Sequence, residues 1–545
     1  MLGLMQNQPL LISSLIRFAE RHHGDAEIVS RRVEGDLHRY TYRDLARRAR
    51  QVAKALDAMK VAASDRVASL AWNGYRHMEL YYGVSGSERV LHTINPRLHP
   101  EQIAWIVNHA EDQVLCFDTT FLPIIQAVHD KCPTVRKWIA LCDADRLPAD
   151  TGIPNLESYE AWIGAQGDDY DWPDFDENTA SSLCYTSGTT GNPKGALYSH
   201  RSTVLHAFAA ALPDVMNISA RDAILPVVPM FHVNAWGTPY TAALAGAKVV
   251  FPGPALDGKS IYELIEAEGV TMAAGVPTVW QMLLNHVSAN GLKFHSLNRT
   301  IIGGSACPPA MIDAFQDQYG VTVLHAWGMT EMSPLGSLST LKNKHLGLPR
   351  DEQMKLLQKQ GRAFHGVDLK IVNAEGQEQP WDGKSYGDLM ARGHWVLHSY
   401  YKGSSPLVED ERGHGWFPTG DVATIDPDGF MQITDRTKDV IKSGGEWISS
   451  IDIENIAMAH PAVAMAACIG MPHPKWDERP IIAVAKKPGA ELTREELLKF
   501  YEGKTAKWQI PDDVVFVDAI PLGATGKMLK TKLREDLKDY KLPGL

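Results

Sequence analysis

Short apolar runs alternate with amphipathic segments through the first two thirds of the chain. The apolar runs are rich in Val, Ile, Leu and Ala, and they occupy residues 66–72, 113–118, 247–252, 299–304 and 321–328. Segments with helical periodicity lie before or after each run. Strands that alternate with helices in this way predict an α/β fold with largely parallel sheets.

The pattern changes after Gly361. Residues 367–376, 386–393 and 422–436 have the pattern of short strands joined by turns. They predict a smaller β-rich subdomain that follows the α/β part of the chain.

The final segment has an α+β pattern of its own. It is expected to contain, in order, a helix at 451–457, strands at 464–471 and 480–487, and a helix at 493–502. We therefore predict an α+β protein overall, with a large N-terminal α/β domain at 1–434, a boundary at 435–440 and a small C-terminal domain at 441–545.

The amino terminus is apolar but has the periodicity of a surface helix. Ile12, Leu15, Ile16 and Ala19 fall on one helical face, and the segment lacks the basic start and small-residue cleavage site of a signal peptide. The apolar region 223–256 is interrupted by prolines, a histidine and a lysine, which favours a buried core over a membrane span.

Length and composition narrow the class of protein. A chain of 545 residues is too long for one hydrophobic core, so at least two domains are expected. The net charge of −11 disfavours a nucleic-acid partner. The six cysteines form no CxxC pair and no zinc pattern, which favours reduced thiols in a cytoplasmic protein.

The segment YTSGTTGNPKG, residues 185–195, is the most specific feature. Glycines let backbone N–H groups converge on an anion, hydroxyls add donors, and Lys194 adds a positive charge, so the segment predicts a phosphate-binding loop. It is not a Walker A motif, because Pro193 precedes the lysine and Gly195 takes the Ser/Thr position. The alternative is a flexible surface turn.

Five further motifs follow this loop along the chain, and all six stand in the order that is typical of one family. The whole chain resembles the adenylate-forming superfamily, which contains acyl-CoA synthetases, luciferases and the adenylation domains of peptide synthetases. The motifs that carry the resemblance are GGSACP at 303–308, WGMTE at 327–331, WFPTGD at 416–421, DRTKD at 435–439 and PLGATGK at 521–527. The resemblance implies that 435–440 is a hinge and that 441–545 is a mobile lid.

The resemblance also implies catalytic roles. Attack of a carboxylate on the α-phosphate of ATP joins two anions, so it needs dispersed positive charge. Lys527 is expected to bridge the two anions, Glu331 to hold Mg²⁺, and Thr330 to donate to the α-phosphate. Taken singly, Thr330 and Glu331 are more typical of a helix start, and Lys527 of a solvated basic face.

The nucleotide site implied by the resemblance is larger. Asp421 would accept both ribose hydroxyls, Arg436 would contact ribose or phosphate, and Trp327 would offer a flat face to adenine. Taken alone, Asp421 is typical of a turn. The full set expected to bind ATP or AMP is Thr186, Ser187, Gly188, Thr189, Thr190, Lys194, Gly304, Ser305, His325, Ala326, Trp327, Gly328, Asp421 and Arg436.

The segment PMFHVNAWG, residues 229–237, indicates which kind of carboxylic acid the protein uses. It contains no acidic residue that could pair with an ammonium group, which disfavours an amino acid. It resembles medium- and long-chain fatty acyl-CoA synthetases and 3-methylmercaptopropionate-CoA ligases, in which the tryptophan resembles a gate of the acyl pocket. A core tryptophan is the alternative. The acyl-pocket candidates are His232, Trp236, Gly275, Val276, Pro277, Gly303 and Met332.

The segment after the hinge resembles the loop that lines the thiol tunnel. Lys442 is expected to act in thioester formation, and glycines would let a thin thiol arm pass close to the backbone. The tunnel candidates are Ser443, Gly444, Gly445 and Trp447. Because no carrier domain accompanies these motifs, free CoA is favoured over a carrier protein as the acceptor.

Glu88 and Arg89 depart from the family pattern, which has small apolar residues there. If they are buried, they need charged or polar partners.

The predicted function is therefore an ATP-dependent acid:CoA ligase with Mg²⁺ as cofactor and a fatty acid or 3-methylthiopropionate as substrate. A luciferase-type oxidase and an inactive nucleotide- or acyl-binding sensor are the alternatives. The resemblance also implies a homodimer.

Overall fold

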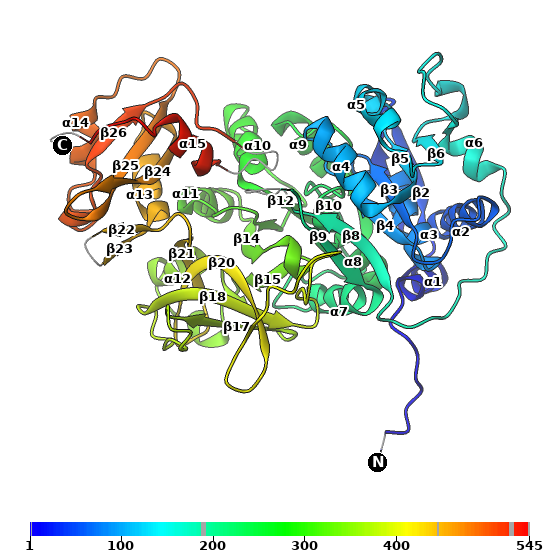
Figure 1. The fold of residues 1–545 in the computed structure, drawn as a ribbon, viewed down its shortest axis with the longest axis horizontal. Helices are drawn as coiled ribbons and strands as arrows, with labels where there is room; N and C mark the ends of the chain where they lie inside the picture. Colours follow the sequence, from blue (N-terminus) through cyan, green and yellow to red (C-terminus); the bar gives the residue numbers. More distant parts are fainter. Residues whose placement is uncertain (2, 187–191, 444–445, 523–527, 543–545) are drawn as a thin grey trace. The chain divides into compact units, whose positions relative to one another are not determined.

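The computed structural model describes residues 1–545 except for 2, 187–191, 444–445, 523–527 and 543–545. The chain forms two compact units (Figure 1). The first comprises residues 1–368 and 392–407, and the second comprises 369–391 and 408–545. Helices and strands alternate as predicted, so the expected mixture of α/β and α+β structure is confirmed. Rotation about a hinge at 435–440 stays a prediction.

One sheet of the first unit is parallel except at its last strand, β9, which pairs antiparallel with β8. The predicted apolar runs at 66–72 and 113–118 form two of its strands, β3 and β5. Its strand order is β7 (Leu156–Ser158), β6 (Lys137–Ala140), β5 (Asp112–Phe117), β3 (Arg66–Leu70), β4 (Val90–Thr93), β8 (Ala180–Tyr185) and β9 (Gly195–Ser199).

The other large sheet of this unit is also parallel in its middle and antiparallel at both ends. The runs predicted at 247–252, 299–304 and 321–328 form β11, β13 and β14. Its order is β16 (Arg362–Ala363), β15 (Leu335–Leu338), β14 (Thr322–Gly328), β13 (Arg299–Ile302), β12 (Met272–Gly275), β10 (Ala223–Pro226), β11 (Lys248–Phe251), β1 (Glu27–Arg31) and β2 (Leu37–Thr41).

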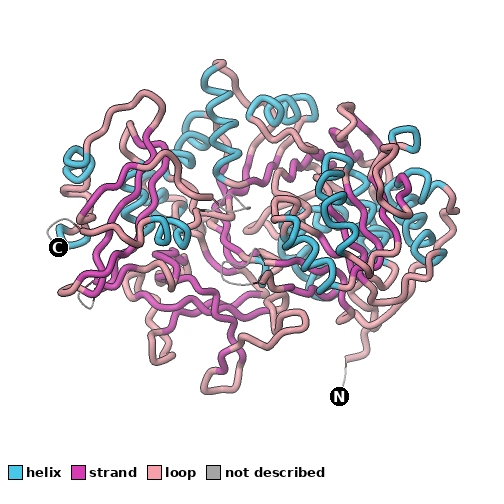
Figure 2. Tube along the Cα trace, turned by 45° about the horizontal axis from the view of Figure 1, so that its top comes forward, coloured by secondary structure: helices cyan, strands magenta, loops and turns pink. Residues whose placement is uncertain are grey.

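Helices pack along these sheets (Figure 2). Trp280 of α10 and Ile265 of α9 are fully buried in a shared core with Phe315. The helices of the unit are α1 (Ile12–His22), α2 (Tyr42–Ala58), α3 (Tyr75–Gly86), α4 (Pro100–Ala110), α5 (Leu122–Val128), α6 (Tyr159–Gly164), α7 (His200–Ala211), α8 (Thr238–Ala245), α9 (Gly258–Glu268), α10 (Pro277–Ala289), α11 (Pro309–Asp313) and α12 (Arg350–Leu357).

The predicted amphipathic helix at the amino terminus is confirmed. Helix α1 buries Ile12, Leu15, Ile16 and Ala19, the four residues assigned to its apolar face. The region 223–256 folds as β10, a short turn, α8 and β11. Within the described part of the chain, no helix has both the length and the apolar character needed to cross a membrane.

The second unit contains the β-rich segment and the C-terminal α+β segment. The β-rich sheet has the order β17 (Val367–Val372), β18 (Tyr386–Gly393), β20 (Gly415–Ile425) and β19 (Val408–Glu409), and β21 (Met431–Arg436) pairs with β20. The other sheet has the order β23 (Glu446–Ile448), β22 (Ile441–Ser443), β25 (Asp477–Lys486) and β24 (Val463–His473), and β26 (Asp513–Phe516) pairs with β25.

The predicted elements of the C-terminal segment are all present. The helix expected at 451–457 is α13 (Ser450–Met458), and that expected at 493–502 is α14 (Arg494–Phe500), whose first turn is capped by Thr493. The strands expected at 464–471 and 480–487 are β24 and β25, and α15 (Lys530–Asp536) follows.

The unusual charge at Arg89 is buried and paired. Its side chain is 6% exposed, and its guanidinium donates to the carbonyl of Val61 and to Asp57 Oδ1, the latter at 2.6 Å. Glu88 is partly exposed. The prediction that a buried charge here needs partners is confirmed for Arg89.

Candidate active site

Four parallel neighbours, β10, β12, β13 and β14, end at one edge of their sheet. The acyl-pocket and adenine candidates of this unit follow those ends: 229–237 follows β10, Gly275 ends β12, Gly303 follows β13 and Trp327 lies at the end of β14. Loops at the carboxyl ends of parallel strands are the usual ligand sites of such sheets. Motifs that are far apart in the sequence are therefore neighbours.

Gly303 lies at the centre of this cluster. A Cβ atom at Gly303 would lie 2.9 Å from the carbonyl oxygen of Ala326 and 3.2 Å from Cη2 of Trp236. A Cβ at Gly304, which has φ of +80°, would lie 3.2 Å from Cγ1 of Val276. Only glycine fits this turn without displacing the tryptophan or the strand, so the fold brings these acyl and adenine candidates together.

The remaining acyl candidates flank the cluster. Gly275 leaves room for the buried indole of Trp280, and Pro277 is the first residue of α10. His232 is half-buried and directly precedes the turn that carries Trp236. Met332 is fully buried at the end of the short helix Thr330–Met332.

Trp236 is presented by a left-handed turn. Residues 233–236 have φ between 47° and 56°, and Gly237 has φ of 74°. Each non-glycine residue in this conformation costs roughly 1–2 kcal/mol, so the turn is strained. The surrounding contacts must hold it in place.

Asn234 supplies several of those contacts. Its amide nitrogen donates to Ser182 Oγ at 2.9 Å, and its amide oxygen faces the hydroxyls of Tyr81 and Thr93 and the thiol of Cys184, each at 3.4 Å. Ser182 and Cys184 belong to β8, the strand that leads into the predicted phosphate loop. The acyl candidate turn and the phosphate loop therefore share one anchor, which the sequence did not reveal.

His325 on β14 is hydrogen-bonded to the turn that carries the adenine candidates Gly304 and Ser305. Its Nε2 accepts from the N–H of Cys307 at 3.2 Å, and its Nδ1 lies 3.0 Å from the carbonyl of Gln358. Burial lowers the pKa of His325 to about 4, so the ring is neutral and one nitrogen is free to accept. The neutral ring holds the turn 303–307 beside β14, while Ser305 remains exposed.

Thr330 and Glu331 form the first turn of a short 3₁₀ helix, and the preceding Met329 takes the N-cap position. The hydroxyl of Tyr198 donates to the carbonyl of Thr330 at 2.5 Å. The hydroxyl of Tyr400 donates to Glu331 Oε1 at 2.8 Å. Neither tyrosine belongs to a motif, and no pattern in the sequence distinguishes them.

The two ends of the predicted phosphate loop are joined. The N–H of Thr186 donates to the carbonyl of Lys194 at 2.9 Å, and the N–H of Lys194 donates to Thr186 Oγ1 at 3.2 Å. The Lys194 side chain is exposed, and its Nζ lies 5.0 Å from the centre of the Tyr400 ring.

The ribose candidates lie in the second unit. Asp421 on β20 and Arg436 on β21 are paired in register, and their side chains form an ion pair. Lys442 is exposed on β22, and Ser443 Oγ accepts from Arg479. Several predicted residues lie outside the described ones: Ser187, Gly188, Thr189, Thr190, Gly444, Gly445, Lys527 and the side chain of Trp447.

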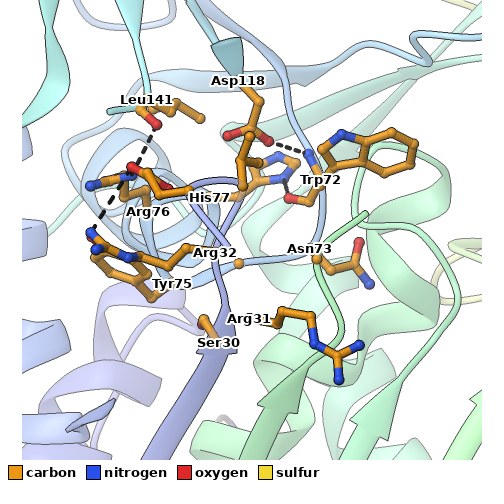
Figure 3. Close-up of a pocket in the computed structure, with 14 residues that line it drawn as sticks. Ser30, Arg31, Arg32, Trp72, Asn73, Tyr75, Arg76, His77, Asp118 and Leu141 are labelled. Atoms are coloured by element: carbon orange, nitrogen blue, oxygen red, sulfur yellow. Dashed lines mark hydrogen bonds and ion pairs between the residues drawn. The ribbon is translucent and has the colours of Figure 1, made fainter. Parts of the chain in front are cut away.

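A small pocket lies elsewhere in the first unit, where β1, β3 and β5 end (Figure 3). Trp72, Asn73, Arg76 and Asp118 are among the residues that line it. Burial raises the pKa of Asp118 to about 7, and its Oδ2 accepts from the N–H of Trp72. Among the described residues, the predicted site has no member in this pocket.

The sequence matches the AMP-binding enzyme family over residues 15–401 and the C-terminal domain of AMP-binding enzymes over 452–527. The chain belongs to this family of adenylate-forming enzymes, and it is an acyl-CoA ligase that uses ATP and CoA as co-substrates.

Three comparisons describe its relatives. The chain is 56% identical over 540 residues to a 3-methylmercaptopropionyl-CoA ligase of Ruegeria lacuscaerulensis, with 99% of each chain covered. It is 54% identical over 542 residues to a medium-chain-fatty-acid–CoA ligase of Ectopseudomonas oleovorans, with 99% of this chain and 98% of the other covered. The fold matches a crystal structure of an anthranilate CoA ligase in complex with anthranoyl-AMP, with a TM-score of 0.84, 23% identity and 98% of each chain covered.

Proposed function

We propose that this enzyme activates a medium- or long-chain fatty acid, or the related acid 3-methylthiopropionate. The observation that carries the proposal is the Trp236 indole beside Gly303, at the strand ends that hold the acyl candidates. The segment 229–237 brings no carboxylate to this region. A pocket formed by these residues would favour an uncharged acyl chain, because each buried methylene contributes about 0.8 kcal/mol.

In the first half-reaction, we propose that a carboxylate oxygen of the acid attacks the α-phosphorus of ATP, which forms the acyl-adenylate and releases pyrophosphate. Lys194 and the glycine-rich loop would hold the phosphates, Thr330 would donate to the α-phosphate, and Lys527 would neutralise the two anions as they approach. Asp421 and Arg436 would bind the ribose. The positively charged residues are assigned to the positions where negative charge gathers during the transfer.

The residues around Glu331 fit a magnesium ion. Its carboxylate is a hard oxygen ligand, and no cluster of three or more His, Cys, Asp or Glu side chains suited to a metal is found among the described residues. Mg²⁺ would therefore take Glu331 together with phosphate oxygens and water, as it does at many nucleotide sites. When bound, it would neutralise phosphate charge.

For the second half-reaction, we propose that rotation about 435–440 exchanges Lys527 for the segment 442–447 at the acyl-adenylate. Lys442 and the glycines of that segment would then guide the thiol of free CoA to the acyl carbon, where the thioester forms and AMP leaves. The homodimer and the cytoplasmic location stay predictions.

A substrate panel tests the proposal. Acids from two to sixteen carbons and 3-methylthiopropionate are compared, and pyrophosphate release and CoA thioester are measured separately. The proposal expects both products with apolar acids. Pyrophosphate exchange without thioester would favour a luciferase-type enzyme, and neither product with any acid would favour a sensor.

The separation of the half-reactions is tested by variants. Lys527→Ala should lower adenylation by about 100-fold or more and still convert supplied acyl-adenylate to thioester. Gly445→Leu and Lys442→Ala should do the reverse. Equal damage to both steps in all three variants would contradict the rotating lid.

A further inference from the structure

The segment 397–401 touches two motifs that lie far apart in the sequence. The N–H of Leu397 donates to the carbonyl of Glu331 at 2.7 Å, and the N–H of Tyr401 donates to the carbonyl of Gly195 at 2.8 Å. One end of the segment is thereby hydrogen-bonded to the backbone of Glu331, the predicted metal ligand, and the other to the backbone of Gly195, the last residue of the predicted phosphate loop. Tyr400 lies between these two attachments.

The hydroxyl of Tyr400 contacts the carboxylate of Glu331. It donates to Glu331 Oε1 at 2.8 Å, and the Glu331 side chain belongs to a residue that is only 8% exposed. A phenol carries its proton at neutral pH, so the Tyr400 hydroxyl is the donor in this hydrogen bond. A hydrogen bond from a neutral donor restricts the rotation of an ionised carboxylate.

The ring of Tyr400 contacts the side chain of Lys194. Lys194 Nζ lies 5.0 Å from the ring centre, within the range of a cation–π contact. The Lys194 side chain is exposed, and this contact with the aromatic face restrains its position. One side chain therefore contacts both charged groups that the proposed function assigns to magnesium and phosphate.

We infer that Tyr400 is a positioning residue that orients the Glu331 carboxylate toward Mg²⁺ through its hydroxyl and braces Lys194 through its ring. The inference rests on the proposed function, because it takes from it the roles of Glu331 and Lys194. Groups that orient a metal ligand are typically worth about 10-fold to 100-fold in metal affinity.

The hydroxyl is tested with Tyr400→Phe, Glu331→Gln and the double variant. Binding of ATP to the full-length protein is measured by calorimetry at a series of Mg²⁺ concentrations, so the result does not depend on turnover. Tyr400→Phe should raise the Mg²⁺ concentration needed for half-maximal binding about 10-fold. It should add no more than about twofold in the Glu331→Gln background, since its effect passes through Glu331.

The ring is tested by comparing Tyr400→Leu with Tyr400→Phe in the absence of Mg²⁺. The leucine variant should bind ATP about twofold to fivefold more weakly than the phenylalanine variant, the scale of an exposed cation–π contact. This difference should vanish in a Lys194→Gln background. Persistence of the difference there would overturn the assignment of the ring.

Tyr401→Phe is the matched control, since it alters the neighbouring ring, which faces His109 and Lys402. It should leave the Mg²⁺ dependence unchanged. If Glu331→Gln shifts the Mg²⁺ dependence and Tyr400→Phe does not, the inference is wrong and the proposed function stands. If neither variant shifts it, Glu331 is not the metal ligand, and both the inference and the metal role assigned to Glu331 fail.

Discussion

Asp421 and Arg436 face each other on the antiparallel strands β20 and β21, and Arg436 Nε lies 2.9 Å from Asp421 Oδ1. Asp421 is 2% exposed, whereas the Arg436 side chain is 42% exposed. The carboxylate is therefore fixed by its surroundings, and the guanidinium that orients it can reach solvent or a ligand.

This pairing predicts that the two residues act together on the nucleotide. Asp421→Asn should raise the KM for ATP about 10-fold or more, because a hydrogen bond to a charged group contributes about 1.5–3 kcal/mol. Arg436→Met should raise it as well, and the double variant should be less than additive. Steady-state kinetics measure this, with the exposed Glu409→Gln on β19 as control. Additive effects would show that the pair does not act as a unit.

Gly303→Ala should change the preference among acids more than it changes ATP binding. The added methyl would lie 2.9 Å from the Ala326 carbonyl oxygen and 3.2 Å from Cη2 of Trp236, so the backbone must shift and the indole must give way with it. Each excluded methylene should cost longer acids about fourfold in kcat/KM. The control is Gly164→Ala, where a methyl meets nothing within 4 Å. If kcat/KM falls equally for acids of all chain lengths, Trp236 does not belong to the acyl pocket.

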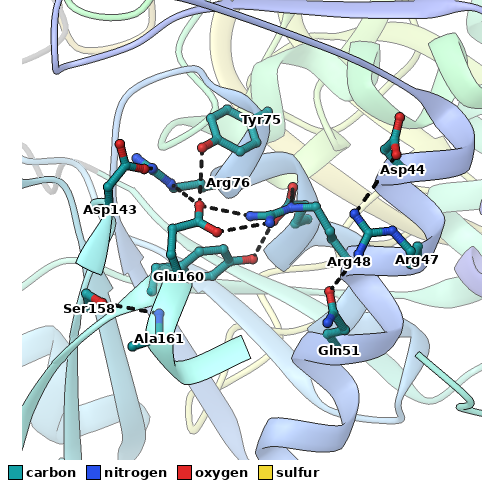
Figure 4. Close-up of polar contacts among 12 residues, drawn as sticks. Asp44, Arg47, Arg48, Gln51, Tyr75, Arg76, Asp143, Ser158, Glu160 and Ala161 are labelled. Atoms are coloured by element: carbon teal, nitrogen blue, oxygen red, sulfur yellow. Dashed lines mark hydrogen bonds and ion pairs between the residues drawn. The ribbon is translucent and has the colours of Figure 1, made fainter. Parts of the chain in front are cut away.

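Breaking a buried charge network should destabilise the first unit (Figure 4). Arg48 on α2 contacts the fully buried Glu79 at 2.7 Å and Glu160 at 2.9 Å. Arg48→Met should cost about 3–5 kcal/mol, because it leaves the buried Glu79 carboxylate without its cation. The partly exposed Glu160, in contrast, keeps its ion pair with Arg76. Arg47→Met, the exposed neighbour, should change stability by about 0.5 kcal/mol or less. Thermal unfolding compares the two, and equal melting temperatures would contradict the prediction.

His325 predicts a loss of stability in mild acid. Burial lowers its pKa to about 4 in the folded protein, against about 6.5 in the unfolded chain, so between these values only the unfolded chain takes up the proton. Stability from this group is present above pH 6.5 and declines as the pH falls toward 4. The slope contributed is at most about 1.4 kcal/mol per pH unit.

His325→Gln should therefore show a smaller drop in melting temperature between pH 7 and pH 5 than the wild type. The control is His22→Gln, which alters an exposed residue of α1. His77, with a pKa lowered to about 4 by burial, adds to the same decline and is unaffected by the change. An identical drop in His325→Gln and wild type would show that the ring is not held neutral.

Local sequence determined most of the elements and the chemistry of the motifs. The strands β3 and β13 lie within the apolar runs at 66–72 and 299–304, which are short enough to favour buried strands, and α1 follows from its 3.6-residue period. The glycines and hydroxyls beside Lys194 predict a phosphate-binding loop in the same local way. These signals lie within a few neighbouring positions, so the sequence displays them directly.

Only the tertiary structure decided which distant residues meet. Tyr400 and Asn234 carry no local signal, because their roles depend on partners at Glu331 and Ser182 that the sheets bring beside them. The left-handed turn that presents Trp236 contradicts the preference of its own residues and exists because surrounding contacts outweigh that preference. Sequence alone thus determined the elements and the kinds of chemistry, whereas long-range packing decided the contacts among them.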